Sequence, residues 1–171
     1  INTTAYAFAT GIHGGDDQDT IVNEGSITST STATGSSDGT AVVILGGFAA
    51  ADAVLTATAT ATGIAGGDGD DVMENHAAIT STATATNNSR SFNYGTFGAV
   101  NGDADTTASA NTYGMNGGEG EDQILNTAAI TATATATTNT NNKAITIGGA
   151  TDASDILSAH ATTAGLLGGE D

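Results

Sequence analysis

Cysteine, proline and tryptophan are absent from this chain of 171 residues, and aromatic residues make up only 4% of it. Without cysteine, neither a disulfide framework nor a cysteine-based metal site can stabilise the fold, which fits a secreted product that does not depend on disulfides. So few aromatic residues leave little material for a bulky core, and we expect any core to be thin. No hydrophobic run approaches the length of a membrane-spanning helix, so no membrane insertion is expected.

Basic residues are almost missing too. Arg90 and Lys143 stand against 19 acidic residues, which gives a formal net charge of -17. This charge repels nucleic-acid phosphates and anionic membranes, and neither is expected as a partner. Cations are the expected partners, because such an acidic body repels itself unless bound metal ions offset its charge or the acids lie far apart on an elongated body.

The sequence does contain a long repeat. The segment 66–71, Gly-Gly-Asp-Gly-Asp-Asp, recurs in similar form at 14–19 and 117–122, and a further copy begins at Gly168. We call these segments the glycine turns. Measured from Gly11, Gly63, Gly114 and Gly165, the spacings are 52, 51 and 51 residues. Such regularity indicates a repeat architecture, here one domain over 1–171 made of a partial repeat 1–10, repeats 11–62, 63–113 and 114–164, and a partial repeat 165–171.

Each repeat also holds two stretches in which threonine alternates with alanine or serine, such as 27–34 and 55–62. A period of two predicts strands with small residues on one face and threonine on the other. Inward alanine would let two sheets approach closely. A short strand after each glycine turn and an apolar strand such as 41–45 complete the repeat, with loops expected at 35–39, 87–95 and 139–143.

These patterns predict an all-β fold, a parallel β-solenoid of the β-helix or β-roll type. Four strands per repeat suggest two coils per repeat and about six coils in all. The two Thr/Ala strands of each repeat would then stack in one sheet and the short and apolar strands in the other. The expected inward row is Ile27, Leu55, Ile79, Ile130 and Leu157. The equivalent residues Asn23, Asn75 and Asn126 are expected at corners, with their amides bonded to the backbone.

The segments 66–73 and 117–124 match the pattern Gly-Gly-x-Gly-x-Asp-x-apolar at every defined position, and 14–21 departs from it at Asp17. They resemble the nonapeptide of haemolysin-type (RTX) calcium-binding proteins, which are large bacterial extracellular proteins. The resemblance implies Ca²⁺ as the cofactor, bound by turn carbonyls and aspartate oxygens of adjacent turns. The alternative is that these are solvated turns without an ion. The expected ligands, including acids of weaker intervening turns, are Asp16, Asp19, Asp52, Asp68, Asp71, Asp105, Glu119, Asp122, Asp152 and Asp155.

An enzyme is not expected. His13, His76 and His160 fall at non-equivalent places in their repeats, which disfavours a zinc site. No Ser/His/Asp grouping recurs, and the glycine turns lack the lysine of a phosphate-binding loop. Polysaccharide lyases with a β-helix usually need a basic residue beside an acidic groove, whereas Arg90 and Lys143 both fall in expected loops.

The threonine faces suggest a second function. Threonines on the rows 27–34, 55–62 and 79–86 would form a flat lattice with about 4.8 Å between coils, which resembles the threonine arrays of ice-binding β-solenoids. The alternative is an ordinary soluble sheet surface, since threonine has a high β propensity.

Together, the sequence predicts an extracellular structural repeat protein, secreted or on the cell surface. It would form a calcium-rigidified rod or filament, such as a surface fibre, an adhesin stalk or a matrix component. The expected partner is a second copy stacked head to tail, because neither end of the chain carries a device that blocks strand edges. The alternative function is an ice-binding solenoid.

Overall fold

The structure is a computed structural model that describes residues 1–168, and within that range the chain is built from strands and turns without a helix. All paired strands run parallel, which confirms the predicted all-β, parallel β-solenoid. The last residues of the partial repeat 165–171, from 169 onward, lie outside the described residues. The strands are β1 (Asn2–Gly15), β2 (Thr20–Asn23), β3 (Ile27–Ile44), β4 (Phe48–Ala50), β5 (Ala53–Asp68), β6 (Val72–Asn75), β7 (Ile79–Thr96), β8 (Ala99–Glu119), β9 (Gln123–Asn126), β10 (Ile130–Ile147) and β11 (Ala150–Leu167).

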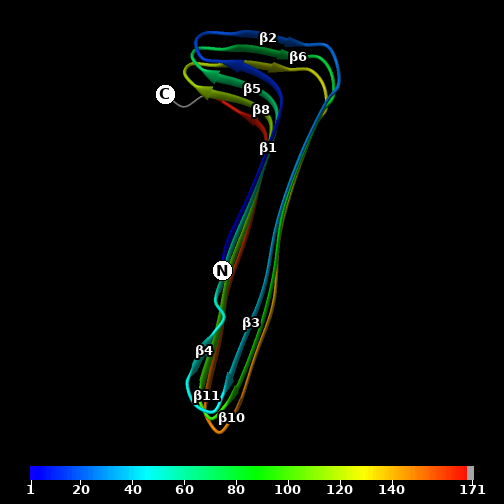
Figure 1. Cartoon of the computed structure of the whole chain (residues 1–171). Coiled ribbons are helices and arrows are strands. Elements are labelled where there is room, and N and C mark those ends of the chain that lie inside the picture. The colour runs from blue at the N-terminus through cyan, green and yellow to red at the C-terminus, as the bar shows by residue number, and fades with distance from the viewer. Residues whose placement is uncertain (169–171) are drawn as a thin grey trace.

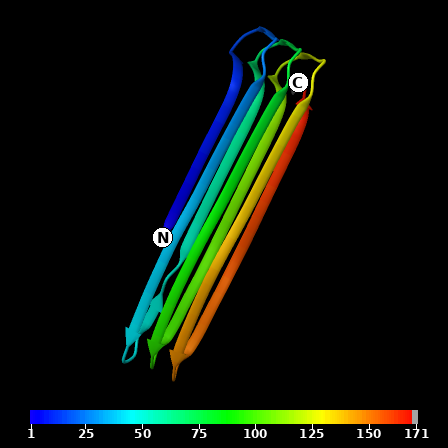
Figure 2. The same cartoon turned by 90° about the vertical axis from the view of Figure 1, so that its right-hand side faces the viewer.

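The strands form three sheets. The A sheet has the order β1-β5-β8-β11, with β4 also paired to β8; the C sheet has the order β3-β7-β10, and the B sheet β2-β6-β9. The A and C sheets face each other along a long, narrow body, and the B sheet closes a wider head (Figure 1). In Figure 2 the long strands lie side by side with little twist. Each coil therefore runs down one side of the body and up the other.

One turn of the solenoid takes one whole repeat. Ile27 pairs with Ile79, and Ile79 pairs with Ile130, so neighbouring strands are a full repeat apart in sequence. The expectation of two coils per repeat is therefore wrong. The reason is strand length, because the Thr/Ala stretches continue through the expected loops and apolar strands to give strands of 18 residues in β3, β7 and β10.

The two Thr/Ala strands of each repeat face each other across the core instead of stacking in one sheet. Ala57, Ala59 and Ala61 of the A sheet pack with Ala83 and Ala85 of the C sheet. The prediction that alanine points inward is confirmed, and the small side chain explains the narrow body. The single inward row expected from Ile27 to Leu157 is wrong, since it divides between the C sheet (Ile27, Ile79, Ile130) and the A sheet (Leu55, Leu157).

The interior changes character along the body. In the head, Ile64 of the A sheet, Met73 of the B sheet and Ile79 of the C sheet belong to one apolar cluster that spans the three sheets. Below the alanines the C sheet contributes polar side chains to the interior: Asn87 and Asn93 are fully buried, and Asn87 Nδ2 donates to the Thr107 carbonyl at 2.6 Å. The A sheet contributes buried apolar residues there, such as Val100 and Ala104. Residues typical of loops are accommodated here because in-register stacking gives each backbone group a partner whatever the local propensity.

Candidate functional site

The glycine turns connect the A sheet to the B sheet at one corner of the head, which we call the glycine corner (14–19, 66–71 and 117–122). Gly15, Gly67 and Gly118 have φ values of 130°, 121° and 110°, which favour glycine. A Cβ on Gly67 would collide with the Gly15 carbonyl oxygen. The glycines are therefore needed for the turn and for the close stacking of one coil on the next.

The last aspartate of each glycine turn forms a ladder that joins consecutive coils. Asp71 Oδ1 accepts the backbone N–H of Asp19 at 2.8 Å, and Asp122 Oδ1 accepts the backbone N–H of Asp71 at 2.9 Å. Asp71 is 0% exposed. The sequence analysis did not predict this backbone role. The feature that indicates it is an aspartate at the last position of all three glycine turns.

The ladder does not fit the calcium cage that the resemblance implied. The Oδ2 atoms of Asp19, Asp71 and Asp122 are buried without a hydrogen-bond partner. Asp71 Oδ2 lies directly against Gly66, where any Cβ would collide with it. Calcium takes about 6–8 oxygen ligands, yet no group of three or more His, Asp or Glu residues that could hold a metal ion occurs within residues 1–168. The Asp71 and Asp122 carboxylates each bond the backbone of the preceding coil, and Asp19 occupies the equivalent place in the first turn.

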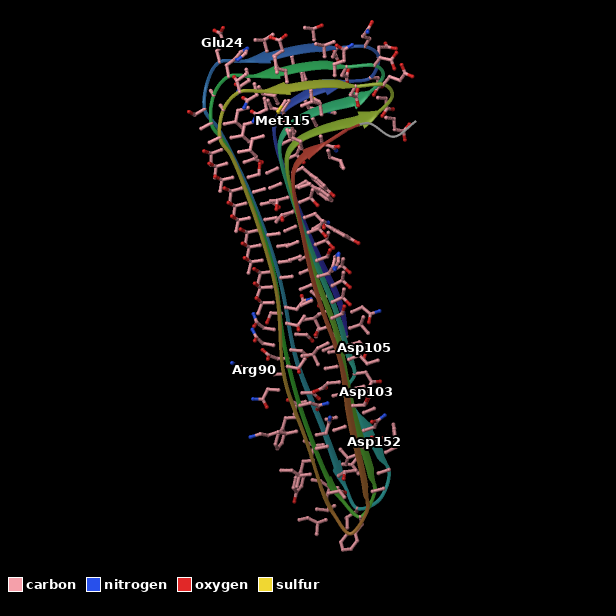
Figure 3. The ribbon with its side chains drawn as sticks, turned by 180° about the vertical axis from the view of Figure 1, so that it is seen from behind. Glu24, Arg90, Asp103, Asp105, Met115 and Asp152 are labelled. Atoms are coloured by element: carbon pink, nitrogen blue, oxygen red, sulfur yellow. The ribbon has the colours of Figure 1, made fainter. Side chains whose placement is uncertain are left out.

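The other expected ligands lie in two separate places. Asp16, Asp68 and Glu119 are exposed at the glycine corner. Asp52, Asp105, Asp152 and Asp155 belong to the A-sheet side of the body, because the intervening turns lie at the opposite end of a coil that takes a whole repeat. Figure 3 shows Asp105 and Asp152 on the body, well below the head. The expected contact between strong and weak glycine turns of adjacent coils is therefore wrong.

The second corner of the head carries an asparagine ladder. Asn23 Nδ2 donates to Asn75 Oδ1 at 2.6 Å, and Asn75 Nδ2 donates to Asn126 Oδ1 at 2.7 Å. Asn75 Nδ2 also donates to the Ala77 carbonyl at 2.8 Å, which confirms the predicted corner role. Both ladders run in one sense: each donor belongs to the earlier coil and each acceptor to the later one.

The last coil exposes positions that are buried in the coil before it. Leu157 and Leu166 are 48% and 51% exposed, whereas their partners Thr106 and Met115 are 1% and 0% exposed. These side chains occupy inward rows that have no further coil to cover them within the described chain. Within residues 1–168, β11 is thus an unpaired edge strand, and the inward side chains beside it contact solvent.

The threonines form an uninterrupted array on one face only. Four outward threonines of β3 pair with four of β7, and these with four of β10. On the A sheet, Tyr6 and Phe8 of β1 and Asn111 of β8 interrupt the corresponding rows. The predicted array of rows 27–34, 55–62 and 79–86 is wrong in one row, because 55–62 lies on the opposite sheet. The array consists of Thr28, Thr30, Thr32, Thr34, Thr80, Thr82, Thr84, Thr86, Thr131, Thr133, Thr135 and Thr137.

The chain matches no protein-family model, and the searches of curated proteins and solved structures found no match. Residues 1–168 include no helix with the length and apolar character needed to cross a membrane.

Proposed function

We propose that this chain is an extracellular structural protein that forms a rod or filament by stacking head to tail. The observation that carries the proposal is the open last coil, where Leu157 and Leu166 occupy core positions in contact with solvent. Exposed apolar rows and unpaired backbone groups favour association with a matching edge. A heterologous contact of this kind does not close and so extends into a fibre.

The first coil supplies the matching edge. A second copy placed beyond the last strand of the A sheet would bring its Ala5 and Ala7 next to Ala159 and Ala161, which continues rows already present between repeats. These pairs join small side chains of equal size, so they continue the packing of the interior. Because the A sheet is four strands deep and the B and C sheets are three, the junction is made through β11 and β1.

The two ladders favour head-to-tail stacking over a symmetric contact. The corners of the last B-sheet strand offer donors to a later coil, Asp122 N–H and Asn126 Nδ2, and those of the first offer acceptors to an earlier coil, Asp19 Oδ1 and Asn23 Oδ1. Stacking head to tail keeps this sense in every copy. Two last coils in contact would place donor against donor and leave polar groups unpaired.

Calcium is part of this proposal as a counter-ion to the exposed acids of the glycine corner, which do not form a ready-made cage of three or more ligands within residues 1–168. Asp16, Asp68 and Glu119 lie in successive coils, and the formal net charge of -17 disfavours a compact stack. Bound Ca²⁺ would reduce this repulsion and make the rod stiffer. The secreted or cell-surface location and the roles as surface fibre, adhesin stalk or matrix component belong to the same proposal.

Assembly is tested with a pair of neighbouring substitutions on β11. Leu157 points into the interior, whereas Ile156 pairs with Asp105 on the outer face. We expect electron microscopy of the unmodified protein to show filaments that lengthen with concentration. Leu157→Lys should block them because it places a charge in the stacking interface, and Ile156→Lys should not. Monomers at every concentration, or equal effects of the two substitutions, would contradict the proposal.

The uninterrupted threonine array supports ice binding as the second candidate function. Its test uses Thr82, in the centre of the array, and Thr58, which lies on the opposite sheet. We expect the protein to shape ice crystals, Thr82→Tyr to abolish the effect by breaking the array, and Thr58→Tyr to leave it intact. Both variants should fold, since both side chains point to solvent. No thermal hysteresis from the unmodified protein would remove this candidate.

A further inference from the structure

Below the threonine array, the outer face of the C sheet carries a strip of different chemistry. Its rows are Ser36, Asn88 and Asn139, then Asp38, Arg90 and Asn141, then Thr40, Phe92 and Lys143. Arg90 and Lys143 are the two basic residues of the chain, and they lie in adjacent rows of neighbouring strands. Figure 3 shows Arg90 on the outer side of the C sheet, across the body from Asp105. We call these nine residues the basic strip.

The charge of the strip contrasts with the rest of the molecule. Asp38 is the acid that projects from it, while the other acids of residues 1–168 lie in the head or on the A-sheet side. The strip therefore has a formal charge of opposite sign to the whole chain. At physiological ionic strength the screening length is about 8 Å, so the acids of the head contribute little at the strip. Across the body, Asp155 Oδ1 accepts from Asn142 Nδ2 at 3.1 Å, beside Asn141 and Lys143, and this acid reduces the attraction for an anion.

Two adjoining hollows give the strip a shape. One, of about 240 Å³, is lined by residues that include Asp38, Arg90, Phe92, Asn141 and Lys143. The other, of about 290 Å³, is lined by Asn88, Ser89, Arg90, Asn139, Thr140 and Asn141. Arg90 and Asn141 border both hollows. A ligand with two consecutive units would place one on each side of these side chains.

The lining groups suit a sugar with an acidic group. Arg90 presents a planar fork of donors that pairs with a carboxylate through two hydrogen bonds, and Lys143 adds a second positive charge. Asn139 Nδ2 donates to Asn88 Oδ1 at 3.0 Å, which orders these amides beside the second hollow. Amide groups can both donate to and accept from hydroxyls. Phe92, 42% exposed, offers an aromatic edge to the apolar side of a sugar ring.

We propose that the basic strip binds a glycan whose mostly neutral chain carries an isolated carboxylate. The carboxylate pairs with Arg90 and Lys143 in the first hollow, and the neighbouring neutral sugar lies against the asparagines in the second. A densely charged polyanion fits less well, because the strip has only two cations and the rest of the chain repels it. This binding is independent of head-to-tail stacking, since the strip lies on the side of the rod.

The test uses sialyllactose as the acidic probe and lactose as its neutral counterpart. Saturation-transfer NMR should detect sialyllactose binding to the unmodified protein, with lactose at least about tenfold weaker because a charge-assisted contact is missing. Arg90→Gln should weaken sialyllactose binding about tenfold or more. Asp38→Asn is the matched control in the same row, and it should preserve or strengthen binding because it removes the one negative charge.

The Leu157→Lys variant should bind sialyllactose as well as the unmodified protein does, so failure of glycan binding is distinguishable from failure of stacking. Absence of sialyllactose binding at millimolar concentration would overturn the proposal, as would equal binding of lactose. Unchanged binding after Arg90→Gln combined with Lys143→Gln would overturn it too. These variants could instead lose lateral association between rods while sialyllactose binding stays unchanged. That result would show that the strip makes contacts between copies, and it would contradict the proposal.

Discussion

At the residue scale, the aspartate ladder explains why the glycine turns recur with so little change. The Asp71 carboxylate is fully buried, and one of its oxygens bonds the Asp19 amide while the other lies against Gly66. The glycine leaves room for the carboxylate, and the carboxylate holds the preceding coil in register. Each turn therefore needs both residues for the backbone alone, before any ion is considered.

Substitutions of Asp71 separate this backbone role from metal binding. Asp71→Ala leaves the Asp19 amide unpaired, and we expect it to lower the free energy of unfolding by about 1–3 kcal/mol. Asp71→Asn keeps an acceptor and removes one of three like charges, so it should cost less. Denaturant titrations in Ca²⁺ and in chelator measure both effects.

The same titrations test calcium at the corner. The unmodified protein should be more stable in Ca²⁺, because binding to the folded state alone stabilises it by mass action, and Asp71→Asn should keep that gain. Loss of the calcium response in Asp71→Asn would show that the ladder is itself the metal site. No response in the unmodified protein would show that calcium has no part in the fold.

At the element scale, the body depends on long strands that face each other through alanine. Ala59 of β5 is 0% exposed and packs in the cluster that joins the A and C sheets. A thin alanine interface buries little apolar area per residue, so the backbone ladder carries a large share of the stability. Any larger side chain must push the two sheets apart.

We expect Ala59→Leu to destabilise the protein by about 1–3 kcal/mol, because overpacking forces side chains or backbone to shift. Thr82→Val, on the outer face, is the control and should stay within about 0.5 kcal/mol of the unmodified protein. Chemical denaturation of the two variants gives the comparison. Tolerance of Ala59→Leu would mean that the sheets are not in close contact.

Sequence patterns predicted the class of fold but not the path of the coil. The spacing of the repeats and the period of two were sufficient for a parallel solenoid, with inward alanines and asparagine corners. The coil count failed because segments such as 87–95 have the composition of loops yet continue as strand. Their conformation is decided by pairing with the next repeat, and local propensity carries no information on that pairing. Because the coil count was wrong, Leu55 and Ile27 were assigned to one inward row. For the same reason, the acids of the glycine corner and the acids of the A-sheet side were combined into one set of metal ligands.

At the scale of the whole molecule, the repeat produces a narrow rod with distinct surfaces. The acids lie mainly in the head and on the A-sheet side, and the C sheet carries the threonine array and the basic strip. The inward rows continue to the last coil, where they meet solvent. The sides of the rod are thus available for ligands, while its ends are suited to another coil.

Cysteine cross-linking tests the central claim, head-to-tail stacking in register, most directly, since the chain has no cysteine of its own. Thr4 and Ser158 occupy equivalent places in the first and last strands of the A sheet, in the outward row that includes Thr56 and Thr107. In a head-to-tail stack they would be adjacent across the junction, about 4.8 Å apart, which suits a disulfide. A mixture of Thr4→Cys and Ser158→Cys chains should form covalent heterodimers on oxidation, and neither variant alone should cross-link. Homodimers of Ser158→Cys alone, or no cross-linking in the mixture, would contradict the account.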